Sequence, residues 1–200
     1  MPIELVHMLK PSYLFFFLVI IELLLWRITR PDPGYEKKDR GSLTIIFLVI
    51  ILSAHVAKLS AQYLPQLGMA LLLGLNEANM LAVYCVGLFA YASGLVLRWF
   101  SVFYLGRLYS FEVAIANDHQ VIDTGPYRYL RHPAYSGSLL SFLGLGICAG
   151  NFVSLLLLTL PIGWALLHRI KIEEAVLTEA LGKNYADYAE KTSRLIPFIY

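Results

Sequence analysis

The sequence predicts an all-α polytopic membrane protein with about five transmembrane helices, a C-terminal helical hairpin and an amphipathic cytosolic helix. Composition is the first reason: 58% of the 200 residues are hydrophobic and only 15% are charged, and the mean hydropathy is +0.63. About a quarter of the residues of a soluble domain are normally charged. The second reason is a series of apolar runs, several of them near the 20 residues or so that a helix needs to cross a bilayer.

The N-terminal half contains three of these runs. The first, residues 12–28, ends in tryptophan without a small-residue cleavage site, which favours an uncleaved span over a signal peptide. The second covers residues 42–64 and the third residues 80–103. Proline and glycine interrupt the segment 65–80 between them, so we expect a short interfacial or re-entrant piece there.

The C-terminal half begins with a tight pair of apolar segments, residues 133–149 and 152–167, separated by Gly150 and Asn151. Gly144, Gly146 and Gly150 have the spacing of small residues that let helices pack closely. From residue 173 to 191 apolar and charged residues alternate at helical spacing. This pattern predicts an amphipathic helix on or beyond the membrane surface.

Positive charges orient the chain. Lysine and arginine cluster after the first span, between the third and fourth, and after the fifth, whereas the segment 65–79 and the Gly150–Asn151 turn have none. The positive-inside rule therefore places the N-terminus outside and the C-terminus in the cytosol. The membrane would be a prokaryotic plasma membrane or the endoplasmic reticulum.

Two polar segments then share the cytosolic face, "DHQVIDTGPYRYLRHPAYSG" and "HRIKIEEAVLTEALGKNYADY". The hairpin would bring His132 close to Glu173 and Glu174, with His168 nearby, and Arg169 shares a helix face with Glu173 at a spacing of four residues. One interpretation is a belt of interfacial anchors, in which such charge pairs are common. The density of mixed charge favours a binding site.

Ionisable residues inside the spans have two interpretations as well. Glu22, His55 and Lys58 lie within or near the first two spans, where such groups often serve function. Interhelical pairing or snorkelling explains them equally simply, and we favour a structural role. We interpret Arg98 as an interfacial anchor at the cytosolic end of the third span.

Some partners are not expected. The formal net charge of +2 and the lack of a basic stripe argue against nucleic acid. A metal site built from His119, His132 and His168 is disfavoured because no carboxylate joins them at a fixed short spacing. Cys85 and Cys148 lie in separate apolar segments and have no ligand spacing, so no metal is expected.

The motifs carry a resemblance to a known family. "RHPAYSG", an apolar hairpin, "EEAVL" and "GKNYADY" follow one another in an order that resembles the isoprenylcysteine carboxyl methyltransferase family, integral membrane enzymes that use S-adenosylmethionine. The resemblance covers residues 105–197. Because the sequence has no internal repeat or low-complexity tract, we expect a single membrane domain, 1–200, with N-terminal transmembrane helices in 1–104. The resemblance implies that the catalytic half is 105–200. More remote phospholipid methyltransferases share the first and third motifs.

The resemblance also implies roles for individual residues. Arg169 matches the arginine that faces the methyl acceptor, and Glu173 matches the acid that binds the cofactor; both are expected to be catalytic. The cofactor, S-adenosyl-L-methionine, would contact His119, Gln120, Val121, Ile122, Tyr127, His132, Pro133, Ala134, Tyr135 and Glu173.

The expected function is methyl transfer to the carboxylate of a prenylated cysteine or a similar lipid-like acid at the cytosolic membrane face. The partners would be that lipid-like acceptor and the bilayer. One alternative is a phospholipid or small-molecule N- or S-methyltransferase on the same scaffold, whose neutral acceptor would have less need of Arg169. Another is a non-enzymatic transporter or scaffold whose cytosolic patch binds anionic head groups.

Overall fold

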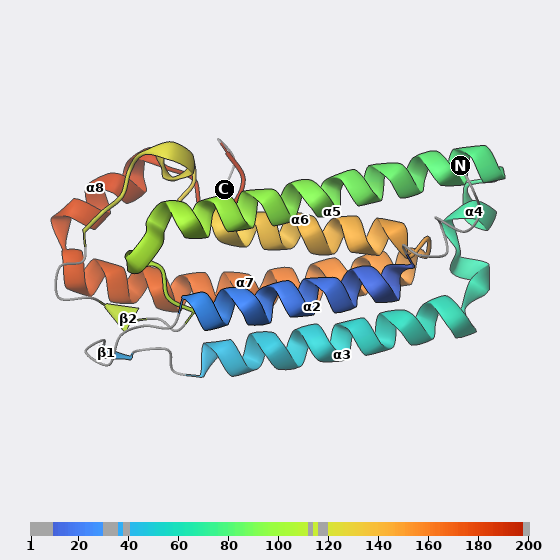
Figure 1. Cartoon of the computed structure of the whole chain (residues 1–200), viewed down its shortest axis with the longest axis horizontal. Helices are drawn as coiled ribbons and strands as arrows, with labels where there is room; N and C mark the ends of the chain where they lie inside the picture. Colours follow the sequence, from blue (N-terminus) through green and yellow to red (C-terminus); the bar gives the residue numbers. More distant parts are fainter. Residues whose placement is uncertain (1–9, 30–35, 38–40, 112–113, 116–119, 198–200) are drawn as a thin grey trace.

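The chain folds into a bundle of roughly parallel and antiparallel helices, as the computed structural model in Figure 1 shows. The structure describes residues 10–29, 36–37, 41–111, 114–115 and 120–197. Apart from β1 (Glu36–Lys37), which pairs antiparallel with β2 (Ala114–Ile115), the regular structure in these ranges is helical. The predicted fold class is confirmed.

Within the described ranges, four helices are long and apolar enough to cross a membrane: α2 (Pro11–Ile28), α3 (Ser42–Tyr63), α5 (Glu77–Leu105) and α7 (Phe152–Leu181). The fourth predicted span forms α6 (Pro133–Cys148), which has only 16 residues. That length gives about 24 Å of helix, less than the roughly 30 Å of bilayer hydrocarbon. The prediction of about five spans is thus met by four long helices and one shorter apolar helix.

The helices α5 and α6 approach each other very closely because glycines face glycines. A Cβ atom added to Gly94 would lie 2.5 Å from the Gly137 carbonyl oxygen, and one added to Gly144 would lie 2.5 Å from the Gly87 carbonyl oxygen. Such separations are far below van der Waals contact, so a side chain at either position would push the helices apart. This packing holds the start of α6 beside the end of α5.

Serines join α3 to α7. The hydroxyls of Ser60 and Ser154 lie 3.0 Å apart, and Ser154 donates to the Ala57 carbonyl at 2.9 Å. Asn151 caps α7 by accepting from the backbone N–H groups of residues 153 and 154, and its side-chain amide donates to the Leu64 carbonyl at 3.0 Å. Hydrogen bonds between helices are valuable where water is absent.

The segment between α3 and α5 does not span the bundle. It forms a 3₁₀ turn, η1 (Pro65–Leu67), and one helical turn, α4 (Met69–Leu72). The backbone N–H of Met69 donates to the Gly150 carbonyl at 2.8 Å, which fixes the segment against the turn between α6 and α7. The prediction of a short non-spanning piece is confirmed.

The amphipathic region is arranged differently from the prediction. Residues 173–181 continue α7 without interruption, because nothing breaks the helix after its apolar part. The break comes at Gly182, whose φ of 56° suits glycine, and α8 (Lys183–Lys191) follows as a separate helix. The single amphipathic helix predicted over 173–191 is therefore wrong.

The chain crosses the bundle in alternating directions, which collects the polar segments at one end. The end of α2, the start of α3, the end of α5, the start of α6, the end of α7 and α8 all lie at the left of Figure 1, while α4 lies at the opposite end. The two polar segments that the sequence singles out meet at this left-hand end.

Candidate active site

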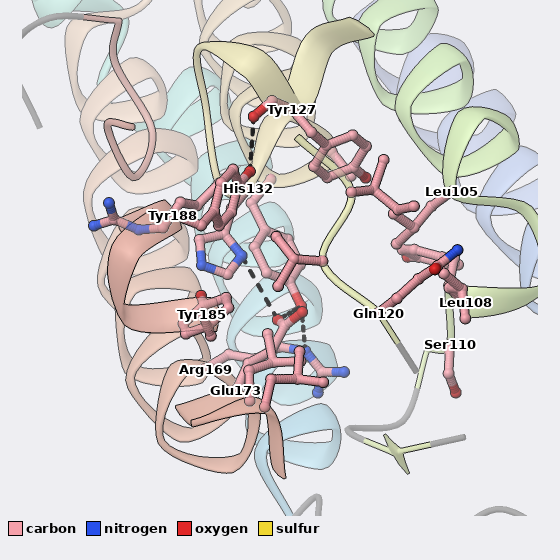
Figure 2. A pocket seen from close by; sticks show the side chains of 18 residues that line it. Leu105, Leu108, Ser110, Gln120, Tyr127, His132, Arg169, Glu173, Tyr185 and Tyr188 are labelled. Carbon is pink, nitrogen blue, oxygen red and sulfur yellow. Dashed lines mark hydrogen bonds and ion pairs between the residues drawn. The ribbon is translucent and has the colours of Figure 1, made fainter. Parts of the chain in front are cut away.

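A pocket opens where the polar segments meet, and we call it the end pocket. Figure 2 shows side chains from the end of α5, the following loop, the start of α6, the end of α7 and α8 around it. Its empty volume is about 850 Å³, including solvent at the mouth. The site residues expected from the sequence that line it are Gln120, Val121, Ile122, Tyr127, His132, Ala134, Tyr135, Arg169 and Glu173.

His119, Pro133 and His168 need separate comment. His119 lies outside the described residues. Pro133 is fully buried at the first position of α6, where its fixed φ suits a helix start. His168, expected near the cluster, instead stacks on Trp164 with ring centroids 5.9 Å apart on the exposed side of α7, so its predicted convergence is wrong.

The expected approach of the two distant segments is confirmed. His132 Nδ1 lies 3.8 Å from Glu173 Oε2, and Tyr135 donates its hydroxyl to the same oxygen at 2.8 Å. The His132 and Tyr135 rings stack with centroids 5.6 Å apart. One turn of α6 therefore places an imidazole and a phenol against the carboxylate of α7.

Tyr135 also connects the two residues expected to be catalytic. Its hydroxyl oxygen accepts from Arg169 Nε at 2.7 Å while its proton goes to Glu173. Arg169 and Glu173 thus lie on one face of α7, as their spacing predicts, with a tyrosine hydroxyl between them. The Tyr135 hydroxyl thus links a guanidinium and a carboxylate of the same helix through two short hydrogen bonds.

Arg169 is almost fully buried, with 3% of its surface exposed. Besides the Tyr135 hydroxyl, it donates to Ser42 Oγ at 2.9 Å and to the Phe111 carbonyl. Ser42 begins α3 and Phe111 lies in the loop after α5, so three separate parts of the chain hold the planar guanidinium in place. Sequence reasoning missed Ser42, because no local pattern marks it as a partner of Arg169.

The end pocket is also lined by tyrosines of α8 and of the loop that precedes α6. The Tyr188 hydroxyl donates to the Tyr127 carbonyl at 2.7 Å, and the Tyr127 hydroxyl donates to the Ser101 carbonyl at 3.2 Å. Burial raises the pKa of Tyr188 above its ordinary value, so this phenol stays protonated and serves as a donor. Tyr185 and Tyr188 line the pocket as well. In the sequence, both lie on the apolar face of the predicted amphipathic pattern and within the motif GKNYADY.

A second pocket, which we call the inner pocket, lies within the helices. Apolar side chains of α2, α3, α5, α6 and α7 form most of its wall, and its empty volume is about 660 Å³. Three residues line both pockets: Tyr109, Tyr135 and Arg169. These shared side chains form the wall between a pocket at the bundle end and one among apolar helices.

A buried ion pair also lines the inner pocket. Arg98 donates through Nε and Nη2 to the two carboxylate oxygens of Glu22, each at 2.5 Å, and through Nη1 to the Ala134 carbonyl at 3.3 Å. Only 6% of Arg98 is exposed. The interpretation of Arg98 as an interfacial anchor is therefore wrong, because its side chain turns inward to Glu22 of α2 rather than outward to head groups.

Comparisons with known proteins agree on one family. The sequence profile of the isoprenylcysteine carboxyl methyltransferase family matches residues 85–179. A probable protein-S-isoprenylcysteine O-methyltransferase of Oryza sativa subsp. indica is 33% identical over 150 residues, which cover 70% of this chain and 78% of the relative. The Schizosaccharomyces pombe protein-S-isoprenylcysteine O-methyltransferase is 34% identical over 125 residues, 62% of this chain and 50% of the relative.

A solved structure supports the fold. The eukaryotic intramembrane Ras methyltransferase, an isoprenylcysteine carboxyl methyltransferase, superposes with a TM-score of 0.61 at 24% identity, over 76% of this chain and 52% of its own. Three observations fit this family: the long apolar helices, the end pocket and the match to the rice relative. The chain belongs to the isoprenylcysteine carboxyl methyltransferase family of membrane methyltransferases.

Proposed function

We propose that this protein transfers a methyl group from S-adenosylmethionine to the carboxylate of a prenylated cysteine, or of a similar lipid-like acid, at the cytosolic face of a membrane. The observation that carries the proposal is the position of Arg169 in the wall between the end pocket and the inner pocket. The names of the rice and fission yeast relatives support the substrate class.

The residues of the end pocket suit S-adenosylmethionine. Glu173 offers a carboxylate to the cationic part of the molecule, and 30% of its side chain is exposed for contact. Tyr127 and Tyr135 offer aromatic surface for an adenine ring. When bound, S-adenosylmethionine would supply a methyl carbon on a positively charged sulfur, which a nucleophile can attack with S-adenosylhomocysteine as the leaving group.

The inner pocket suits the lipid chain of the acceptor. Its wall is largely aliphatic and aromatic, with Ile46, Phe142 and Ile162 among the buried contributors. A prenyl chain placed there would leave its carboxylate near Arg169, whose planar fork binds carboxylates and stays charged at any working pH. The acceptor would reach this pocket from the bilayer and the cofactor would reach the end pocket from the cytosol.

The reaction then needs alignment and dehydration rather than a base. A carboxylate is already ionised at neutral pH, and a hydrated carboxylate is a poor nucleophile. Arg169 would hold the acceptor carboxylate, and Glu173 would balance the positive charge of the methyl donor. Tyr135 would keep Arg169 and Glu173 in fixed relative positions through its hydrogen bonds of 2.7 and 2.8 Å. The buried wall would keep water away from the reacting carboxylate.

In this proposal the catalytic half, residues 105–200, forms the end pocket, and the N-terminal helices in residues 1–104 line much of the inner pocket. The sequence segments that are rich in lysine and arginine support a cytosolic position of the pocket end, since the positive-inside rule would put them in the cytosol. The protein is an integral membrane protein; a prokaryotic plasma membrane or the endoplasmic reticulum would be its location.

The test is transfer of labelled methyl from S-adenosylmethionine by the purified, detergent-solubilised protein. A panel of lipid-like acids, amines and thiols serves as acceptors, with N-acetyl-S-farnesylcysteine among the acids. We expect methyl esters of the prenylated acid and no product with its amide, which lacks the carboxylate. Labelling of amines or thiols alone would overturn the proposed acceptor class, and failure of the folded protein to bind S-adenosylhomocysteine would overturn the cofactor.

A further inference from the structure

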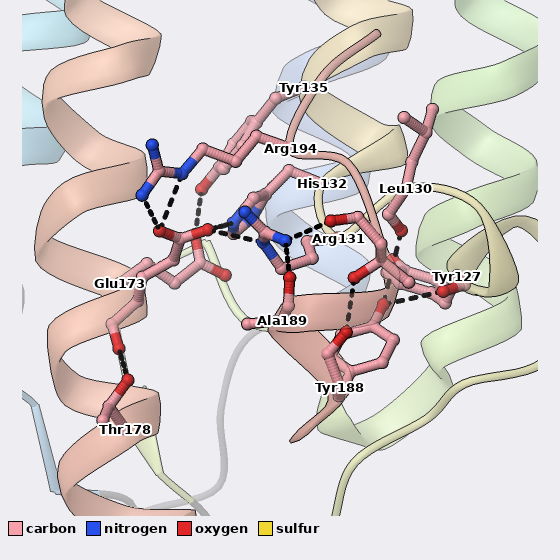
Figure 3. A network of polar contacts seen from close by, with 12 residues as sticks. Tyr127, Leu130, Arg131, His132, Tyr135, Glu173, Thr178, Tyr188, Ala189 and Arg194 are labelled. Carbon is pink, nitrogen blue, oxygen red and sulfur yellow. Dashed lines mark hydrogen bonds and ion pairs between the residues drawn. The ribbon is translucent and has the colours of Figure 1, made fainter. Parts of the chain in front are cut away.

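The second glutamate of the pair, Glu174, does not line the end pocket among the described residues, yet its carboxylate contacts Arg131, His132 and Arg194. Figure 3 shows these three side chains within one polar network. Oε1 accepts from Arg131 Nε at 2.8 Å and lies 3.3 Å from His132 Nε2. Oε2 accepts from Arg194 Nε at 2.9 Å and pairs with Nη2 at 2.9 Å. Only 14% of the Glu174 side chain is exposed, so these contacts are poorly screened.

The same network ties down residues 192–195, which we call the C-terminal strap. The backbone N–H groups of Arg131 and His132 donate to the carbonyls of Ser193 and Arg194 at 2.8 and 3.1 Å. Ser193 N–H donates to the Tyr129 carbonyl at 3.2 Å, and the Ser136 hydroxyl donates to the Leu195 carbonyl at 2.7 Å. The strap thus runs along the residues that lead into α6.

Arg131 adds a third connection, from the strap to α8. Its Nη1 donates to the Ala189 carbonyl at 2.5 Å, near the end of α8, and to the Thr192 carbonyl at the start of the strap. The Arg131 side chain is 10% exposed. Arg131 therefore joins α8 and the strap to Glu174 on α7.

The pocket depends on this network through His132. The imidazole has Glu174 on its Nε2 side and Glu173 on its Nδ1 side, at 3.3 and 3.8 Å, and stacks on Tyr135. A carboxylate that anchors one ring nitrogen fixes the direction of the other. If the anchor were neutral, the His132 ring, the strap and the start of α6 would lose their common attachment to α7.

We propose that Glu174 is a positioning residue: its carboxylate fastens the His132 ring and the C-terminal strap to α7, and so keeps the end pocket in the shape that binds the methyl donor. The proposal rests on the proposed function of the end pocket. Glu174 acts through His132, Arg131 and Arg194 rather than by touching the ligand.

The experiment is calorimetric titration of the purified full-length protein with S-adenosylhomocysteine, for wild type, Glu174→Gln, Arg194→Gln and the double variant. Glu174→Gln keeps the shape of the side chain and removes the negative charge that faces the guanidinium groups of Arg131 and Arg194 and the His132 ring. We expect its Kd to rise about tenfold to a hundredfold, since small misplacements of binding groups have effects of this size. Glu190→Gln, an exposed site on α8, is the matched control and should leave the Kd unchanged.

The stoichiometry of binding separates positioning from simple misfolding. A variant that only folds poorly would show fewer sites with an unchanged Kd, whereas a mispositioned pocket shows a full complement of weaker sites. Arg194→Gln removes the ion pair between the strap and Glu174 at a residue whose side chain is 35% exposed, and we expect a several-fold rise in Kd. The double variant should bind no more weakly than Glu174→Gln, because both changes break the same connection.

Several outcomes would overturn the inference while leaving the proposed function intact. A folded Glu174→Gln protein with wild-type Kd is one, and strictly additive effects of the two changes are another. If Glu174→Gln does not fold, Arg194→Gln decides alone: a raised Kd supports the inference and a wild-type Kd contradicts it. Absence of binding by the wild-type protein would instead refute the cofactor assignment itself.

Discussion

At the scale of single residues, the site is a short chain of charges joined by a tyrosine. Arg169, Tyr135 and Glu173 are linked by hydrogen bonds of 2.7 and 2.8 Å, and Ser42 holds the far side of the guanidinium at 2.9 Å. The arginine and the glutamate were predictable because they lie four residues apart on one helix. The serine was not, since 127 residues separate it from Arg169 and no local pattern marks it.

The planar guanidinium group of Arg169 gives the first prediction. In Arg169→Lys the positive charge remains, but the planar array of donors to Tyr135, Ser42 and the acceptor carboxylate is lost. We expect kcat/KM for the prenylated acid to fall about a hundredfold, which corresponds to about 2.7 kcal/mol of transition-state stabilisation. Steady-state kinetics with labelled S-adenosylmethionine measure it.

Lys171→Arg is the matched control, because it makes a conservative cation exchange on the exposed side of the same helix. Its kinetic constants should equal those of the wild type. Equal kcat/KM for Arg169→Lys and wild type would show that a point charge is sufficient and that the fork has no role in holding the acceptor.

The Glu22–Arg98 pair shows a different limit of prediction at this scale. An arginine that anchors a helix in head groups and one that turns inward to a carboxylate give the same local sequence pattern. What separates them here is a partner 76 residues earlier, at 2.5 Å, and the Ala134 carbonyl of α6. The structural role that we favoured for Glu22 agrees with this pairing. The inward direction of the Arg98 side chain, by contrast, could be found only from the tertiary structure.

At the scale of helices, close packing of α5 on α6 is what places the start of α6 at the pocket. Gly87 and Gly94 of α5 face Gly144 and Gly137 of α6, respectively, with backbone against backbone. The sequence identified small residues in α6 as packing positions but did not reveal that their partners are the glycines of α5. That choice depends on how the helices pair in space, which spacing along one helix does not determine.

This interface gives the second prediction. A methyl group at Gly94 would lie 2.5 Å from the Gly137 carbonyl oxygen and 2.5 Å from the Ser141 nitrogen, both backbone atoms that cannot move independently. We expect Gly94→Ala to destabilise the protein by about 1–3 kcal/mol, the usual cost of overpacking. Denaturant unfolding in a fixed detergent measures the change.

Gly163→Ala is the matched control within a helix. An added Cβ there meets only the Leu139 Cδ1 atom, at 3.6 Å, which is an ordinary contact. Its stability should stay within about 1 kcal/mol of the wild type, on the stabilising side, because alanine favours the helix more than glycine. Equal effects of the two substitutions would show that α5 and α6 do not approach as closely as described.

At the scale of the whole molecule, alternating passes through the bundle collect the polar segments at one end. The end pocket, α8, and the β1–β2 pair all lie there, and the α4 turn lies at the other end. The distribution of lysine and arginine along the sequence matches this division. If the positive-inside rule governs this protein, the pocket faces the cytosol, where S-adenosylmethionine is made available.

Orientation is the third prediction, tested by labelling single cysteines in intact cells. After Cys85 and Cys148 are replaced, Gln66→Cys at the α4 end and Asn184→Cys at the pocket end each supply one exposed thiol. We expect a membrane-impermeant maleimide to label Gln66→Cys in intact cells and Asn184→Cys only after permeabilisation. The reverse pattern would place the pocket outside and would contradict the proposed cytosolic supply of cofactor.

The sequence by itself determined the properties that are local or additive. Hydropathy located the helices, because crossing hydrocarbon requires long apolar runs, and charge bias gave an orientation that labelling can check. Helical spacing put Arg169 and Glu173 on one face, and the ordered motifs indicated the family. The tertiary structure alone decided which distant groups touch: Ser42 on Arg169, Glu22 on Arg98, and the C-terminal strap on Glu174. Those contacts depend on the relative rotation and approach of whole helices, and no periodicity along one segment encodes that.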